Sequence, residues 1–550
     1  TADFQFNGYN DNMPIMWTWA LAFGGELLGD ARFTKVAWAN LCQLRDLLRR
    51  RGTVSEYGAN YATHRLTGLA RLATHSRDAR IRELAGQCEA RIWAELAGHW
   101  SPAVAQIGGA AMRGGYPLNQ ETPALLRQVF GDALTKIPWR YHFEEEPKAT
   151  VRSYGLDESR YLFAYPFGYG AEFASAEYHV PDAVAELFYQ KPVGFTFQCT
   201  AENAYTHGGI FCKQVPVYGQ GGVLITTKLT DEVVVIKDHP EHAAQPHALT
   251  TYHGANYVIG TSTTAQFATS HAFRCTYRRA HGFGDVFVRY NINDKIPGGR
   301  TKNRYWKSPD YSDEKENYCE LYYDCGSTHC LQHRNTVLCL QRPEYFECWD
   351  IRSLRTDIFF WQGGGPVEPV VHNDGLITLQ DGAVYIAIHP LIGRSDDRQQ
   401  ALKVSTVGLW RIISLYNYEG ASRSFTPHEI AKFGNGFVFE VRDADDYPSF
   451  AAFQGEMQES RILDHHYASR RRVHYARPDL RLSTQFCPYT KTVMNSSING
   501  REHVCPPFAY SDGRHTGLPF LEAQESPGFA DWDWIVTQAA REIERYNPAD

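Results

Sequence analysis

Four polar clusters bring together the amide, phenol, imidazole and guanidinium groups with which this chain could do chemistry. They are Asn10-Asp11-Asn12, Ser55-Glu56-Tyr57 with Asn60 and Tyr61, Arg113-Gly114-Gly115-Tyr116, and Tyr205-Thr206-His207. Amides and guanidinium groups stabilise negative charge on a carboxylate, whereas Tyr and His side chains transfer protons. Together these groups are suited to proton abstraction next to a carboxylate.

Removal of the C5 proton of a uronic acid fits these groups. That proton is weakly acidic unless hydrogen bonds from Asn or Arg neutralise the neighbouring carboxylate. A Tyr or His then takes the proton, and a second such group protonates the leaving oxygen. The residues predicted to be catalytic are Tyr57, His207, Tyr116 and Arg113. Those predicted to bind substrate are Asn10, Asn12, Glu56, Asn60, Tyr61, Tyr205 and His253, with His271 as a weaker candidate.

Each cluster also has a purely structural interpretation. Asp11 or Asn12 could cap the helix that follows, and His64 could lie satisfied in a helical core. The polar run around His207 is also typical of a turn. His99, at the end of a helix, could simply place a positive charge at the negative end of the helix dipole.

Two other functions remain open on the sequence. Glycoside hydrolysis requires two carboxylates roughly 5 to 9.5 Å apart, and Asp11, Glu56 and Glu121 could supply them. A glycan-binding protein without catalysis would use the aromatic side chains, which make up 13% of the chain, because their rings offer flat apolar faces. The same aromatic content is also typical of β-strands.

Composition argues against several classes of function. The 550 residues carry a net charge of −7, so no general basic surface indicates nucleic acid. No apolar run reaches the roughly 20 residues needed to cross a bilayer, and no membrane partner is expected. Walker A, G-x-S-x-G, H-E-x-x-H and dinucleotide motifs do not occur, so phosphate and nicotinamide chemistry have no support. A chain that starts at Thr1 rather than Met is compatible with a secreted or periplasmic protein.

The 12 cysteines do not indicate a structural zinc site of the usual kind. Five lie close together, at 319, 325, 330, 339 and 348, but no C-x-x-C pair occurs among them. No metal site is predicted and no cofactor is expected to be obligatory. A structural Ca²⁺ or Zn²⁺ stays open, with His329 and His333 as candidate ligands. Cys42 and Cys88 occupy apolar helical positions and are expected to be buried thiols.

The elements that must position these residues change type near residue 140. Apolar residues recur at helical spacing before it, and the expected helices span 14–28, 32–50, 60–74, 78–100 and 122–134. Short β-branched and aromatic runs follow, with clear alternation over 285–292, which predicts stacked antiparallel sheets. We therefore predict an α+β multidomain chain. Its parts are helices over 1–140, an antiparallel β-sandwich over 141–400, and further strands over 401–550 with a C-terminal helix at 532–546.

This order of elements resembles polysaccharide lyases of the heparinase II/III and alginate lyase type. The block from Ser55 to Tyr61, the Gly/Arg/Tyr loop at 108–116 and strands such as 381–388 carry the resemblance, which extends loosely over most of the chain. It implies an α/α toroid, here partial because five helices are expected, then β-sandwich sheets with a cleft between them. It also implies β-elimination on uronic acids, metal-independent or metal-assisted, with an acidic polysaccharide as the partner.

Overall fold

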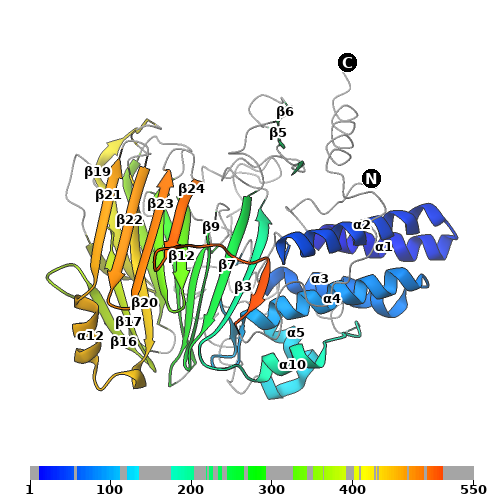
Figure 1. The fold of residues 1–550 in the computed structure, drawn as a ribbon, viewed down its shortest axis with the longest axis horizontal. Helices are drawn as coiled ribbons and strands as arrows, with labels where there is room; N and C mark the ends of the chain where they lie inside the picture. Colours follow the sequence, from blue (N-terminus) through cyan, green and yellow to red (C-terminus); the bar gives the residue numbers. More distant parts are fainter. Residues whose placement is uncertain are drawn as a thin grey trace.

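The computed structural model places helices beside stacked antiparallel sheets (Figure 1). It describes residues 12–54, 59–111, 121–134, 175–203, 218–219, 222–226, 233–237, 245–265, 271–280, 282–292, 326–343, 351–362, 365–391, 402–407, 410–426, 429, 433–467, 470–487 and 492–511. The predicted α+β class is confirmed for this part of the chain. None of the helices in these ranges is long and apolar enough to span a membrane.

The helical region contains a helix at each place where apolar periodicity predicts one. The helices are α1 (Asn12–Leu28), α2 (Ala31–Arg51), α3 (Ala59–His75), α4 (Ala79–His99) and α5 (Glu121–Phe130), the last continued by the 3-10 helix η1 (Gly131–Leu134). Asp30 and Asp78 cap α2 and α4, because each carboxylate accepts a hydrogen bond from a backbone N–H of the first turn. Gly52 ends α2 with a φ of 85°, which favours glycine.

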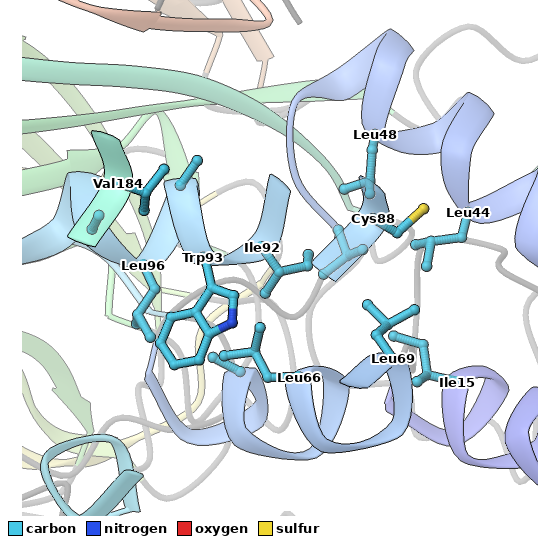
Figure 2. Packing of buried hydrophobic residues seen from close by; sticks show 14 of the residues in the cluster. Ile15, Leu44, Leu48, Leu66, Leu69, Cys88, Ile92, Trp93, Leu96 and Val184 are labelled. Carbon is cyan, nitrogen blue, oxygen red and sulfur yellow. The ribbon is translucent and has the colours of Figure 1, made fainter. Parts of the chain in front are cut away.

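One apolar core joins these helices to the edge of the largest sheet. Figure 2 shows Trp93 of α4 next to Leu66 of α3, with Leu44 and Leu48 of α2 in the same cluster. The cluster continues through strand residues that include Phe195, Phe197, Leu249, Phe508 and Tyr510. Cys42 and Cys88 are buried thiols in this core, as predicted, and burial raises the pKa of Cys42 to about 11.

Two departures from the predicted period switch appear. Strands β1 (Trp100–Ser101) and β2 (Gln106–Ile107) pair antiparallel within the region predicted to be only helical. Helix α10 (Asp182–Tyr189) lies in the region predicted to be β, and its Val184, Leu187 and Phe188 join the helical core. Both elements are stabilised by tertiary packing at the ends of α4. Local periodicity does not indicate which segments of the chain pack there.

The strands form three large antiparallel sheets. The nine-stranded sheet runs β18 (Leu402–Val407), β19 (Trp410–Arg423), β14 (Ile351–Trp361), β11 (Phe283–Ile292), β10 (Phe273–Arg278), β8 (Tyr257–Ser262), β7 (Gln245–His253), β3 (Phe195–Asn203), β26 (Phe508–Tyr510). The seven-stranded sheet runs β15 (Val370–Val371), β16 (Ile377–Asp381), β17 (Val384–Pro390), β20 (Asn435–Asp443), β13 (Thr336–Pro343), β12 (Gly326–His333), β9 (Thr264–Ala265). The five-stranded sheet runs β21 (Arg461–Tyr467), β22 (Arg470–Arg477), β23 (Leu480–Cys487), β24 (Thr492–Ile498), β25 (Arg501–Glu502). A small sheet holds β4 (Tyr218–Gly219), β5 (Gly222–Thr226) and β6 (Val233–Lys237).

The three large sheets stack as layers. One core, with residues such as Phe273, Val288 and Phe439, separates the nine- and seven-stranded sheets. Another, with Leu338 and Tyr475, separates the seven- and five-stranded sheets. Helix α12 (Phe450–Gln458) packs Phe453 and Met457 against the seven-stranded sheet. The helical region therefore lies at the β26–β3 side of the nine-stranded sheet, far from the five-stranded sheet (Figure 1).

The boundary predicted at residue 400 does not separate two sheets, which corrects that part of the domain prediction. Strand β19 pairs with β14, and β20 pairs with β13 and β17. Strands from both sides of residue 400 thus share two sheets, because antiparallel partners can be distant in sequence. The helix predicted at 532–546 lies outside the described residues.

Candidate functional site

Most residues predicted to act on a substrate lie outside the described part of the chain. These are Tyr57, His207, Tyr116, Arg113, Asn10, Glu56 and Tyr205. Asn12 begins α1, and Asn60 and Tyr61 lie in the first turn of α3. His253 is the last residue of β7, and its side chain is described. The single cleft predicted for these residues therefore stays a prediction.

Three of the undescribed segments begin at one end of the nine-stranded sheet. Gly52 forms a parallel bridge with Thr200 of β3, shortly before the segment that holds Tyr57, and β3 itself leads into the segment that holds His207. Ala111 and His271 form an antiparallel bridge with N–O distances of 3.0 and 2.7 Å, and Arg113 follows Ala111 closely. Strands β3, β7, β8 and β10 are consecutive neighbours, so the two bridges are about 14 Å apart across the sheet. The starting points of the three segments are compatible with one site.

A group of polar side chains lies on the face of the nine-stranded sheet that residues 100–111 cover. Val104 packs against Val258 and Phe283 on that face. Side chains alternate along a strand, so the odd-numbered residues of β11 lie on the same face as Phe283. The polar group, which we call the polar band, consists of His271, Arg274, Asp285, Arg289, Asn291, Arg355, Asp357 and Ser414. All of these side chains are buried.

Arg289 and His271 form the part of the band nearest the Ala111 bridge. Arg289 Nη2 lies 2.8 Å from His271 Nε2. Because a guanidinium can only donate, Nε2 accepts and the neutral imidazole carries its proton on Nδ1. The His271 ring packs edge-on against Phe287, with centroids 5.2 Å apart. A cation and a group able to transfer a proton are thus joined close to the segment that holds Arg113.

The two carboxylates of the band are each held by several donors. Asp357 accepts hydrogen bonds from Arg355 Nε at 2.9 and 3.0 Å, from Ser414 Oγ at 2.5 Å, and from Asn291 Nδ2. Asp285 accepts from Arg274 Nε and from a threonine hydroxyl of β10, both at 2.9 Å. These contacts offset the free-energy cost of removing the two carboxylates from water. An unpaired carboxylate buried to this extent would be strongly destabilising.

An aromatic group adjoins the polar band on the same face. The rings of Phe287 and Phe359 stack with centroids 4.9 Å apart, and Trp410 packs edge-on against both. The ring centroids of Trp361 and Trp410 are 4.9 Å apart. Such rings stabilise the sheet by burying apolar area, and their flat faces are also suited to sugar rings.

The sequence contained a signal for part of this site. The alternation over 285–292 places Asp285, Arg289 and Asn291 on one face, but by itself it predicts only a strand. The partners Arg355 and Asp357 come from β14, and the register that sets Asp357 opposite Arg289 is non-local. Alternation indicates which side chains share a face and does not indicate which strand lies next to it.

His253 joins the sheet to helix α4. The side chain is 2% exposed, and Nε2 donates a hydrogen bond to the carbonyl oxygen of Gly98 at 2.8 Å. Burial, and then the charge of Lys191, lowers its pKa well below the usual value. In the structure this imidazole connects α4 to the sheet. The predicted role in a cleft would instead require an exposed side chain.

His99 does not supply the positive charge to the end of α4 that its position suggested. Burial, and then the charge of Lys191, lowers the pKa of His99 to about 3, so the ring is neutral. Its Nδ1 lies 2.8 Å from Thr251 Oγ1. The donor at this helix end is Lys191, whose Nζ donates to the carbonyls of Trp100 and Leu187 at 2.6 Å each, and burial lowers its pKa well below the usual value.

A second polar group lies in the helical region beside the segment that holds Glu56 and Tyr57. Glu95 of α4 accepts a hydrogen bond from Thr53 Oγ1 and lies 4.0 Å from Arg65 Nη2. Arg91 Nε donates to the carbonyl of Gly52 at 3.1 Å, and burial lowers the pKa of Arg91 to about 9. These contacts fix the end of α2, from which that segment starts.

Within the described ranges, no group of three or more His, Cys, Asp or Glu side chains is placed to hold a metal ion. His329, proposed above as a candidate ligand, instead directs Nδ1 at the carbonyl of Thr263 and stacks on Phe486. Burial lowers the pKa of His329 to about 4. The expectation that no cofactor is obligatory stays a prediction.

Comparison with known proteins adds no relative. No protein-family model matches the chain, and no curated protein matches its sequence.

Proposed function

We propose that this protein is a polysaccharide lyase that cleaves a uronic-acid-containing polysaccharide by β-elimination and leaves unsaturated uronate ends. The observation that carries the proposal is the Arg289–His271 pair, on the sheet face covered by residues 100–111 and beside the Ala111 bridge. In this proposal the helices form a partial α/α toroid and an acidic polysaccharide is the substrate. A secreted or periplasmic location belongs to the same proposal.

The chemistry requires a cation at the uronate carboxylate and two groups for proton transfer. A guanidinium has five N–H donors, and Arg289 donates through Nη2 to His271 Nε2 and through Nη1 to the carbonyl of Val288. Arg289, together with Arg113, would stabilise the enolate-like transition state next to the carboxylate. Tyr57, Tyr116 or His207 would take the C5 proton and protonate the leaving oxygen.

Spacing in the sheet disfavours a hydrolase that uses the carboxylates of the polar band. Asp357 lies opposite Arg289 in the strand register, and Asp285 lies four residues before Arg289 on β11. Asp285 and Asp357 are therefore about 14 Å apart by strand geometry, whereas a glycosidase pair needs about 5 to 9.5 Å. Each carboxylate is also held by an arginine. A hydrolase would have to use Glu56, Asp11 or Glu121 instead.

A panel of acidic polysaccharides tests the reaction. A lyase gives products with the ultraviolet absorbance of a new C4–C5 double bond. New reducing ends without that absorbance would establish a hydrolase. Retention of the protein on the polymers with no product of either kind would establish a glycan-binding protein and overturn the enzyme proposal.

Variants then assign the groups. His207→Ala or Tyr57→Phe should lower kcat by about 10²-fold if that residue transfers a proton. Full activity in both would remove them from the mechanism. Glu56→Gln should keep activity in a lyase and lose it in a hydrolase that depends on this residue. Activity that appears only with added Ca²⁺ or Zn²⁺ would overturn the expectation of no obligatory cofactor.

Arg289 and Arg274 make a matched pair for the polar band. Both are buried on the same face, but Arg274 binds Asp285 whereas Arg289 contacts a neutral histidine. Arg289→Lys should lower kcat by about 10²-fold or more in protein that remains folded, as expected when a group that stabilises an oxyanion is displaced. Arg274→Lys should lower stability with little change in kcat. Equal kcat in the two variants would give Arg289 a structural role only.

A further inference from the structure

Arginines gather on the exposed face of the five-stranded sheet. In β22, Arg471, Val473 and Tyr475 are buried, whereas Arg470 and Arg472 are exposed. Alternation continues in β23 and β21, so that a set of side chains shares the outer face. The set, which we call the arginine face, consists of Arg461, Arg470, Arg472, Arg481, His465, His474, Ser483, Gln485, Asn495 and Ser497.

The strand register fixes the spacing of these side chains. Arg472 lies opposite His465 on one side and Gln485 on the other, and Gln485 lies opposite Asn495. Arg470 is two residues from Arg472 along β22, which corresponds to about 7 Å. Rows of cations and amides thus cross the sheet at regular intervals, as a linear chain with repeating charges would require.

Asp464 and Asp479 are used by arginines of the other side of the sheet, whereas Glu502 of β25, opposite Ser497, lies at the edge of the arginine face. Asp464 binds the inward-facing Arg471 and lies 3.3 Å from His466. Asp479, at the β22–β23 turn, contacts Arg477 at 3.2 Å. In the part of the chain that the structure describes, no carboxylate lies within salt-bridge distance of the four outward arginines, and Arg472 Nη2 donates to Gln485 Oε1 at 3.4 Å. A chain with net charge −7 therefore presents a local positive surface here.

We infer that the arginine face binds a linear acidic polysaccharide, at a place separate from the polar band. Guanidinium groups recognise carboxylates and sulfates through paired hydrogen bonds. Ser483, Gln485, Asn495 and Ser497 lie among them and can bond to sugar hydroxyls. Figure 1 shows these strands at the opposite side of the molecule from helices α1–α4, so a polymer held here would extend beyond the polar band.

A polysaccharide fits this face better than a nucleic acid. Binding of single strands depends on aromatic rings that stack on bases, and reading of a duplex needs an element that enters a groove. The outward side chains described on β21–β25 include no Phe or Trp, and the surface is a sheet rather than a projecting helix.

The test measures the affinity of the full chain for alginate, heparin, neutral dextran and single-stranded DNA. The variant is Arg470→Gln, Arg472→Gln and Arg481→Gln together. We expect its Kd for alginate and heparin to rise about tenfold, because each exposed ion pair contributes little alone. Dextran should not bind. Thermal unfolding should be unchanged, because these side chains are exposed.

A matched control removes three positive charges from the helical region, as Arg32→Gln, Lys35→Gln and Arg80→Gln, all of them exposed positions. This control should keep the affinity of the unaltered chain. Unchanged affinity in the arginine-face variant, or an equal loss in the control, would overturn the inference. DNA binding that is tighter than polysaccharide binding and is lost in the arginine-face variant would also overturn it. None of these outcomes depends on catalysis, so failure here and failure of the proposed reaction are distinguishable.

Discussion

Two sheets of this protein carry arginines on one face and treat the charges in opposite ways. On the nine-stranded sheet, Arg274 and Arg355 are buried and each binds a buried aspartate. On the five-stranded sheet, Arg470 and Arg472 are exposed, and the described residues offer them no carboxylate. The difference shows that a buried arginine bound to an aspartate is committed to the fold, whereas an exposed arginine without such a partner is available to a ligand.

Three consecutive arginines show the same contrast within one strand. Arg471 faces inward, donates to Asp464 at 3.0 and 2.6 Å, and donates to the carbonyl of Asn435 at 2.7 Å. Its neighbours Arg470 and Arg472 face outward. A buried guanidinium without a partner would be very unfavourable, so the inward position carries partners that the outward positions do not need.

The largest effect is expected from breaking a buried pair on the nine-stranded sheet. Asp357→Asn removes the carboxylate that faces the buried charge of Arg355, which should lower the free energy of unfolding by about 3–5 kcal/mol. Urea denaturation measures it. The control is Glu368→Gln on the exposed pair with Arg411, where Glu368 is 76% exposed and the change should stay within about 0.5 kcal/mol. Equal losses in the two variants would remove the contrast between buried and exposed charges.

A smaller effect is expected from the inward arginine of β22. Arg471→Gln should lower the free energy of unfolding by about 3 kcal/mol, because the carboxylate of Asp464 loses its charged partner. Arg472→Gln, one residue further, should change it by less than about 0.5 kcal/mol. Denaturation of both variants in parallel checks the comparison. A larger loss of unfolding free energy in Arg472→Gln than in Arg471→Gln would contradict the comparison.

Acid should weaken the same pair. Burial alone would raise the pKa of Asp464, but the charge of Arg471 and hydrogen bonds from His466 and Arg471 outweigh it, and the net pKa is lowered. A lowered folded-state pKa means that the stabilisation is present above the unfolded value of about 3.9 and is lost as pH falls through the folded value. The stability difference between the unaltered chain and Asp464→Asn should therefore shrink below about pH 4. A difference that stayed constant well below that pH would contradict the assignment.

The smallest effect concerns the exposed face itself. Burial, and then the charges of Arg472 and His465, lowers the pKa of His474, so this imidazole is neutral at pH 7. The facing groups are His465 and Leu463 on β21 and Ser483 on β23. Binding of alginate should strengthen by on the order of twofold as pH falls below the ordinary His value, as one more exposed ion pair forms. His474→Gln should remove part of this change, and an unaltered profile would exclude a contribution from His474.

Local patterns predicted much of the fold. The apolar stripes of α2 and α4, the glycine after Arg51 and the alternation over 285–292 all correspond to elements of the structure. They are predictable because helix and strand periods act over a few residues. Strands β1–β2 and helix α10 were missed, since each is short and is stabilised by contacts with α4 and with the core around it.

The candidate site was less predictable. The residues chosen from polar clusters lie mostly outside the described ranges, and His253 proved to be a buried joint between β7 and α4. The polar band has no single cluster in the sequence, because His271, Arg289 and Asp357 come from separate segments of the chain. Buried charge pairs form between strands, and strand pairing is not a local property.

The sequence by itself determined the class of the fold, the positions of the long helices and the faces of the clearest strands. The tertiary structure decided which of those faces became buried and which remained exposed. It set Arg289 opposite Asp357 and beside His271 by pairing distant segments, and it directed Arg471 inward while Arg470 and Arg472 stayed in solvent. The physical reason is desolvation, because a charge that the packed layers remove from water requires a partner, whereas a charge in solvent does not.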